Sequence, residues 1–228
     1  MAPKDIFINR EISWLDFNAR VLQEASDIEV PLLERLRFIG IFSNNLDEFF
    51  QVRYATVQRI AQSEKSGKKV FGGKSAKELL KSITQKVIEQ QKETNKILSD
   101  IEYELENENI YFINENNVLS EHEDFLKEYF IQKVSPALMT IIISEDLPQD
   151  FSNNHAFLAV KLSFESPIPK NKYALIEIPT ELDRFIVLPS IGEKEFVMIL
   201  DDLIRFHFEL IFNSFEYIFA ISFLLEFV

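Results

Sequence analysis

Hydrophobic positions in the first part of the chain recur at the spacing of an α-helix. The segment REISWLDFNARVLQEAS, residues 10–26, places Ile12, Leu15 and Leu22 near one helical face. This pattern predicts an amphipathic helix, preceded by a short extended piece at residues 6–9. The rest of the first half continues in the same way.

Three further helices follow from the same periodicity. Pro31 is suited to the first turn of a helix over residues 31–43, and a third helix is expected to start within FSNNLDEFFQVR and to run to about residue 62. A long fourth helix is predicted over residues 76–109. The apolar stripe expected for the second helix consists of Leu32, Leu33, Leu36 and Ile39. Four amphipathic helices in succession predict a bundle.

The pattern changes near residue 107, where short runs of β-branched and aromatic residues begin. Strands are predicted at residues 110–114, 155–165, 172–179 and 184–189, a helix at 120–138, and a strand that leads into a helix at 197–212. The predicted fold class is therefore α+β, an N-terminal helical bundle followed by a mixed α+β head domain. The expected domains are residues 1–106 and 107–228.

Composition narrows the functional classes. The 228 residues carry a net charge of −13 and no cysteine, which excludes a thiolate nucleophile, a disulfide framework and a cysteine metal site. An acidic chain is poorly suited to nucleic acid or an anionic membrane, so no nucleic-acid partner is expected. The start of the chain does not resemble an export signal, and a cytoplasmic location is expected. The apolar stretch 210–228 contains Glu216 and Glu226 and lacks basic flanks, so a core segment is predicted rather than a transmembrane span.

The start of the third helix is unusually polar. Ser43, Asn44 or Asn45 could cap it, and Asp47 and Glu48 would face the positive end of the helix dipole. Capping requires one asparagine, and two are present. Two interpretations of Asn45 therefore stay open, a cap or a ligand contact. The acids would repel phosphate, so a ligand contact would suit the hydrogen-bonding edge or the ribose of a nucleotide.

Basic side chains gather in one loop of this acidic chain. SEKSGKKVFGGKS, residues 63–75, includes Lys68, Lys69 and Lys74, which could attract polyphosphate or a nucleotide electrostatically; the alternative is a solvated surface loop. The loop is not a nucleotide P-loop, because the spacing requires glycine at position 68 and a strand before it.

The three histidines give no sign of a metal site or a nucleophile. His122, His155 and His207 lie far apart in sequence without paired-ligand spacing, and structural roles are predicted for all three. No metal ligands are predicted in this chain.

Several motifs occur in an order that resembles a known family. FINREISWLDFNARVLQEA, PLLERLRFIGIFSNNLDEFFQVR, YFINE and ILDDLIRFHFELIF, within residues 5–214, resemble the N-terminal part of a bacterial polyphosphate kinase of the first type. The resemblance implies an N-terminal helical domain and a head domain that precede two catalytic domains. It also implies reversible, magnesium-dependent transfer of the terminal phosphate of ATP to inorganic polyphosphate through a phosphohistidine. The expected location remains cytoplasmic, with peripheral attachment to the inner membrane left open.

The resemblance also assigns individual roles. It maps an ATP contact onto Asn45 and implies a homo-oligomer formed through the head domain. After IFNSFEY the sequence departs from the TRDAE-like motif of the family, so a truncated or frame-shifted product or a fragment is expected. The catalytic histidine and the magnesium ligands would lie outside this chain, which alone should not transfer phosphate. The alternative function is a non-catalytic oligomerisation or interaction module.

Overall fold

The computed structural model describes residues 9–63, 75–143, 156–163, 171–212 and 219–226. Contacts group the chain into two compact units, residues 1–107 and 108–228. The first unit is helical and the second combines helices with two sheets, which confirms the α+β fold class. Whether the units are separate domains with the expected boundary between residues 106 and 107 stays a prediction.

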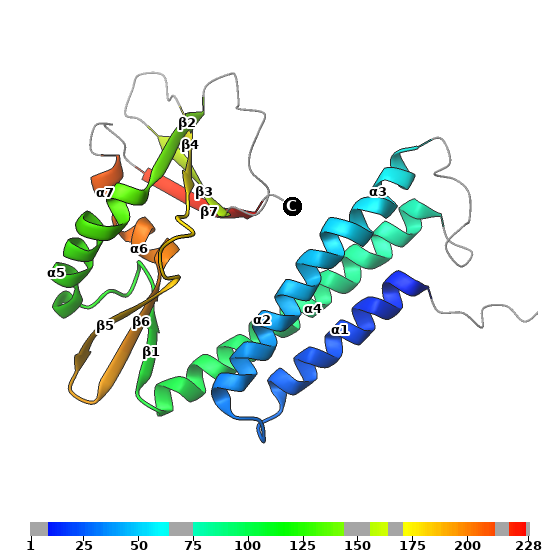
Figure 1. Ribbon diagram of the computed structural model, residues 1–228, viewed down its shortest axis with the longest axis horizontal. Helices are drawn as coiled ribbons and strands as arrows, with labels where there is room; N and C mark the ends of the chain where they lie inside the picture. Colours follow the sequence, from blue (N-terminus) through cyan, green and yellow to red (C-terminus); the bar gives the residue numbers. More distant parts are fainter. Residues whose placement is uncertain (1–8, 64–74, 144–155, 164–170, 213–218, 227–228) are drawn as a thin grey trace, which may run out of the picture. The chain divides into compact units, whose positions relative to one another are not determined.

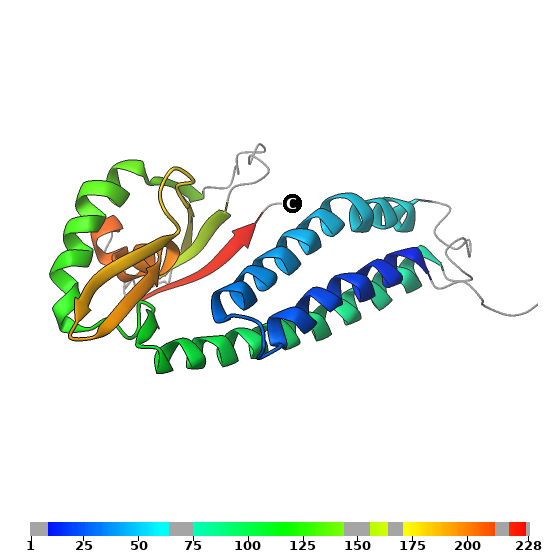
Figure 2. The same ribbon diagram turned by 60° about the horizontal axis from the view of Figure 1, so that its bottom comes forward.

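In its described part, the first unit consists of three helical rods rather than the four helices expected (Figure 1). They are α1 (Arg10–Ser26), a continuous rod made of α2 (Leu32–Glu48), the π-helical turn η1 (Phe49–Tyr54) and α3 (Ala55–Gln62), and finally α4 (Ala76–Asn107). The helices predicted at 10–26 and from 76 onward are confirmed. The break predicted between the second and third helices is wrong, and Figure 2 shows the rod passing through it as one coil.

The polar stretch around Asn45 lies inside this rod, so it does not start a helix. The backbone N–H of Phe49 donates to the carbonyls of Asn45 and Leu46, and that of Ala55 donates to Phe50 in the wider π pattern. Asn45 therefore does not cap a helix, and Asp47 does not face a free helix N-terminus. The buried residues Phe42, Leu46 and Phe49 continue the apolar stripe across the expected break, and their packing outweighs the local start signal.

The true helix starts use other side chains. Asn9 caps α1, where its Oδ1 accepts from the backbone N–H groups of Glu11 at 3.0 Å and Ile12 at 3.3 Å. Ser75 and Glu78 form a capping box before α4, with the Ser75 N–H donating to Glu78 Oε2 at 2.7 Å and the Glu78 N–H donating to Ser75 Oγ at 3.3 Å. After α4 the chain turns at Asn109, which adopts φ 63°.

One charged residue takes a position in the interior of the bundle. Arg35 is 3% exposed, whereas Leu33, predicted to face inward, is 63% exposed. The Arg35 Nε donates to the carbonyl oxygen of Ala25 at 2.8 Å, and its Nη1 lies 2.9 and 2.8 Å from the two carboxylate oxygens of Glu104. Arg35 thus ties α2 to the end of α1 and to α4.

The second unit contains two sheets and the helices that pack on them. Its elements are β1 (Ile110–Ile113), α5 (Ser120–Tyr129), the π-helical turn η2 (Phe130–Val134), the 3-10 turn η3 (Ser135–Ala137), β2 (Met139–Ile143), β3 (Ala156–Ser163), β4 (Asn171–Glu177), β5 (Phe185–Ile191), β6 (Lys194–Ile199), α6 (Leu200–Phe206), α7 (Phe208–Ile211) and β7 (Phe219–Glu226). One sheet has the order β1-β6-β5, with β1 parallel and β5 antiparallel to β6. The other is antiparallel with the order β2-β4-β3-β7.

Two of these strands were not predicted. β2 follows the end of a helical segment directly, and β7 comes from the C-terminal apolar stretch and pairs with β3. The other predicted strands are present with small shifts at their ends. None of the helices within the described ranges is both long and apolar enough to cross a bilayer.

Candidate functional site

The carboxamide of Asn45 is held by a second asparagine from the neighbouring helix. Asn45 Nδ2 donates to Asn18 Oδ1 at 2.9 Å, and Asn18 Nδ2 donates to the backbone carbonyl of Phe42 at 3.1 Å. Asn18 lies on α1 and is 1% exposed, whereas Asn45 is half-buried. The two amides therefore form a short hydrogen-bonded chain from the interior of the bundle toward its surface.

A cleft lies one helical turn from this asparagine pair, between α1 and the π-helical turn. Its volume is about 350 Å³. Trp14 and Phe49, each four residues from one of the asparagines, line it and stack with ring centroids 4.9 Å apart. Asn45 itself does not line the cleft. The residues that do are Arg10, Glu11, Trp14, Glu48, Phe49, Val52, Arg53, Thr56 and Val57.

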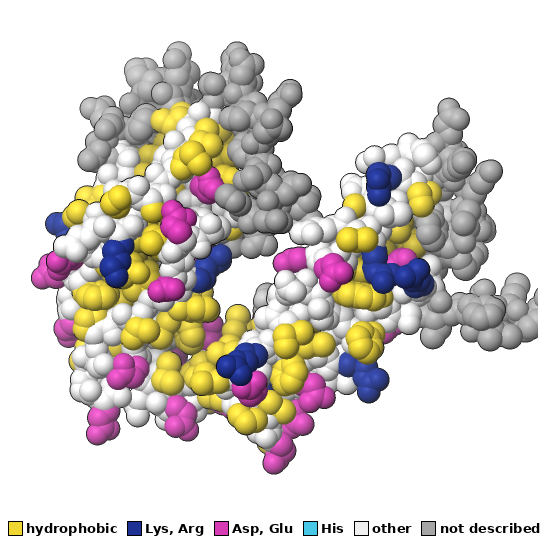
Figure 3. Space-filling model, viewed as in Figure 1, with side chains coloured by type: hydrophobic (Ala, Val, Ile, Leu, Met, Phe, Trp, Pro, Cys, Tyr) yellow, Lys and Arg dark blue, Asp and Glu magenta, His cyan; other side chains and the backbone are white. Residues whose placement is uncertain are grey.

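The charges around the cleft cancel. Arg53 Nη1 lies 3.2 Å from Glu11 Oε2, and the guanidinium lies 5.8 Å from the centre of the Trp14 ring. Arg10 and Glu48 add one charge of each sign. Figure 3 shows basic side chains near the N-terminal end of α1 with hydrophobic surface beside them. The cleft therefore has no excess of positive charge to attract a phosphate chain.

Lys68, Lys69 and Lys74 lie outside the described residues, so their role in attracting polyphosphate stays a prediction. In the ranges that the structure describes, no three His, Cys, Asp or Glu residues form a group that could hold a metal ion.

Two histidines are packed into the second unit, and His155 lies outside the described ranges. His122 is fully buried, with Nε2 2.9 Å from the carbonyl of Pro189. His207 stacks on Phe130 with centroids 4.4 Å apart, and its burial lowers its pKa. These contacts are those of core residues, in line with the structural roles predicted for them.

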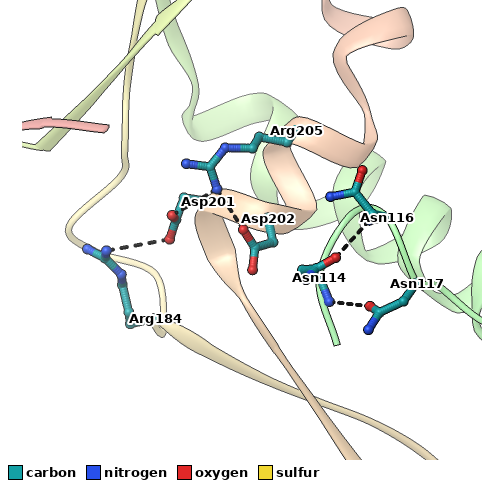
Figure 4. Close-up of polar contacts among 7 residues, drawn as sticks. All are labelled: Asn114, Asn116, Asn117, Arg184, Asp201, Asp202 and Arg205. Carbon is teal, nitrogen blue, oxygen red and sulfur yellow. Dashed lines mark hydrogen bonds and ion pairs between the residues drawn. The ribbon is translucent and has the colours of Figure 1, made fainter. Parts of the chain in front are cut away.

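A second polar cluster lies at the start of α6 (Figure 4). Arg205 Nη1 lies 3.1 Å from Asp201 Oδ2 and 2.6 Å from Asp202 Oδ1, and Arg184 Nη2 lies 3.4 Å from Asp201 Oδ1. Burial, followed by the neighbouring charge of Asp201, raises the pKa of Asp202 to about 6. Two guanidinium groups face two carboxylates, so the cluster is charge-balanced and resembles a structural ion-pair network.

Asn18 is the residue that sequence reasoning missed. It occupies the buried stripe of α1, among Leu15, Leu22 and Ala25. A polar residue at an apolar helix position signals a buried hydrogen bond, because an unpaired carboxamide there would be costly. This signal is present in the sequence, although it does not identify the partner.

Comparisons with known proteins agree along most of the chain. Residues 7–113 match the family model of the polyphosphate kinase N-terminal domain, and residues 121–225 match that of the polyphosphate kinase middle domain. The polyphosphate kinases of Vibrio parahaemolyticus and Yersinia pestis are each 36% identical over 221 residues, covering 94% of this chain and 31% of the relative. That of Escherichia coli K12 is 35% identical with the same coverage.

The fold agrees with these matches. The crystal structure of polyphosphate kinase from Porphyromonas gingivalis matches with a TM-score of 0.83 and 30% identity, covering 97% of this chain and 33% of that one. The chain thus spans about a third of the length of the relatives it matches. With both family models matched in sequence order and the fold shared, the chain belongs to the polyphosphate kinase family and carries its N-terminal and middle-domain portion.

Proposed function

We propose that this chain is the nucleotide-contacting part of an enzyme that reversibly transfers the terminal phosphate of ATP to inorganic polyphosphate. The observation that carries the proposal is the Asn45 carboxamide, held by Asn18 beside an aromatic, charge-balanced cleft. A neutral amide next to stacked rings suits the nucleoside and leaves the phosphates to point elsewhere. Family membership supplies the reaction, and Asn45 is the residue proposed to contact ATP.

The transfer chemistry itself is assigned to the remainder of the longer relatives. Among the described residues, no histidine or lysine lines the cleft, so the lining side chains described offer no phosphate-accepting imidazole. We place the phosphohistidine and the Mg²⁺ ligands in that remainder, and no step through the metal is assigned to residues of this chain. The 228 residues alone are proposed to be inactive in transfer, and the full enzyme to act in the cytoplasm.

Asn45→Ala tests the nucleotide contact in a full-length kinase that carries this N-terminal sequence. We expect the KM for ATP to rise about tenfold with a smaller change in kcat, because one hydrogen bond to the bound nucleotide is lost. Steady-state kinetics with ATP as the varied substrate measure both constants. Asn44→Ala, at the exposed neighbouring position, is the matched control and should leave the KM unchanged. An unaltered ATP KM in Asn45→Ala would remove the nucleotide role from this residue.

A second candidate function is a non-catalytic oligomerisation or interaction module formed by the head domain. It is favoured by β5, an edge strand on which Phe185 and Val187 are 58% and 65% exposed. The homo-oligomer proposed for the full enzyme would use the same unit. We expect light scattering to give a dimeric mass for the purified chain, and Val187→Lys to lower that mass to the monomer. A monomer before any substitution would count against this candidate.

A further inference from the structure

The hydrogen-bond donors and acceptors of Asn18 and Asn45, between α1 and α2, can be assigned in only one way. The carbonyl oxygen of Phe42 can only accept a hydrogen bond, so the group of Asn18 that faces it at 3.1 Å must be the NH₂. The Oδ1 of Asn18 then faces Asn45. The group of Asn45 that lies 2.9 Å from this oxygen must be its NH₂, because only a donor can pair with an acceptor. Neither amide can be flipped without placing two acceptors or two donors opposite each other.

The consequence concerns Asn45, at the outer end of this pair of hydrogen-bonded amides. With its nitrogen committed to Asn18, Asn45 leaves its Oδ1 without a protein partner among the described residues. This oxygen is not one of the fully buried polar atoms that lack a partner, and the residue is half-buried, so the oxygen is open to a ligand. What the helical unit offers at this point is a hydrogen-bond acceptor of fixed orientation.

We propose that Asn18 is a positioning residue that makes Asn45 present this acceptor, so that the site selects a purine that carries an amino group at its 6-position. The proposal rests on the nucleotide role proposed for Asn45. A 6-aminopurine donates an N–H to the oxygen, whereas a 6-oxopurine would place its own oxygen against it. The site would therefore prefer ATP to GTP.

The surroundings favour a base over the other donors of a nucleotide. Phe17, directly before Asn18 on α1, keeps its side chain 67% exposed, whereas Phe49 is 1% exposed and is covered by the ring of Trp14. An exposed aromatic face attracts a base through stacking, whichever base it is. Stacking holds the base, and the hydrogen bond from its edge distinguishes one purine from the other. A ribose hydroxyl is the alternative donor, which the experiment separates.

The test compares nucleotide preference in a full-length kinase that carries this N-terminal sequence. For Asn18→Leu we expect the ratio of kcat/KM for ATP to that for GTP to fall about tenfold, mainly through KM, because the freed Asn45 amide can rotate to suit either purine. Gln90→Leu is the matched control. Gln90 is also a buried amide of the bundle and donates to the carbonyl of Leu15 at 2.9 Å, but it has no bond to Asn45. It should affect stability in a similar way and leave the ratio unchanged.

A second experiment uses the unmodified enzyme with nucleotide analogues, so it does not depend on whether a variant folds. Purine riboside 5′-triphosphate lacks the 6-amino group, and we expect its KM to be about tenfold above that of ATP. The 2′-deoxy and 3′-deoxy forms of ATP should be used almost as well as ATP. Equal use of purine riboside triphosphate and ATP would overturn the proposal, as would a defect confined to the deoxy forms, which would identify the ribose as the donor.

The outcomes also separate this inference from the proposed function. If Asn45→Ala raises the KM for ATP but Asn18→Leu preserves the ATP/GTP ratio, the positioning role is overturned and the nucleotide contact stands. If Asn45→Ala leaves the KM unchanged, the nucleotide role fails first, and the selection of a 6-amino group at Asn45 fails with it.

Discussion

Replacing Arg35 by alanine is expected to lower the free energy of unfolding of this chain by about 2–4 kcal/mol. The substitution leaves the carbonyl of Ala25 without its side-chain donor and removes both bonds to Glu104. It also empties space in a well-packed interior, since Arg35 is 3% exposed. Urea unfolding followed by circular dichroism at 222 nm should show the midpoint moving to lower urea.

Arg37→Ala is the matched control for this substitution. Arg37 lies two residues further along α2, its side chain is 73% exposed, and it pairs with Glu34 at 2.5 Å. An exposed pair of this kind contributes little, so we expect a loss below about 0.5 kcal/mol. Glu104→Gln removes the charge of the ion pair and keeps the bond of Arg35 to the Ala25 carbonyl. We expect it to lower the free energy of unfolding by less than Arg35→Ala does, because Glu104 is 41% exposed. Equal midpoints for the two arginine variants would show that Arg35 does not tie the three rods together.

A second large effect is expected from Asp202, in the cluster of Figure 4, and it depends on pH. Burial raises the pKa of Asp202 from 3.8 to about 6, so the folded chain holds its proton over a range in which the unfolded chain has released it. Folding is therefore favoured by this group at low pH, and that contribution is lost as the pH rises from about 4 to 6. Asp202→Asn removes the cost of ionisation. At pH 7.5 we expect this variant to be more stable than the parent by about 1–2 kcal/mol, a value reduced from the full shift because the group is partly solvated.

The difference between pH 4 and pH 7.5 identifies the cause. Urea midpoints of the parent and of Asp202→Asn should nearly coincide at the lower pH and separate at the higher. Asp124→Asn changes an exposed carboxylate of α5 and should give the same small difference at both values. A stabilisation by Asp202→Asn that does not vary with pH would exclude proton uptake as its origin.

The helices of the first unit could be predicted from the sequence because their apolar stripes are long and regular. The stripe of α4 that includes Leu79, Ile83, Ile101 and Leu105 is buried as its spacing indicates. The false break near Asn45 has a physical origin. Serine and asparagine followed by acids favour a helix start locally, but here the partner of Asn45 comes from another helix. Only the tertiary contact distinguishes a cap from a buried amide network.

The candidate site shows the same limit. Asn45 could be singled out because two adjacent amides exceed what capping requires, whereas its partner Asn18 lies 27 positions earlier and no local pattern links them. The π-helical turn that lines the cleft has no marker in the sequence, since a helix with one wide turn has the same composition as a regular one. The strand β2 was hidden because it follows a helical segment without a loop.

The π-helical turn affects how the rod that contains it packs against its two neighbouring helices. A residue added to a helical turn rotates everything after it by about 100° relative to what comes before, as 3.6 residues complete one turn. The rod that contains η1 packs on α1 and α4 through α2, and on α4 through α3. The wide turn thus changes the direction in which the following side chains point, so the apolar stripe of α3 can face a different side of the rod from that of α2. A loop would also have re-aimed it, but a rod keeps the residues beside the cleft on a rigid support.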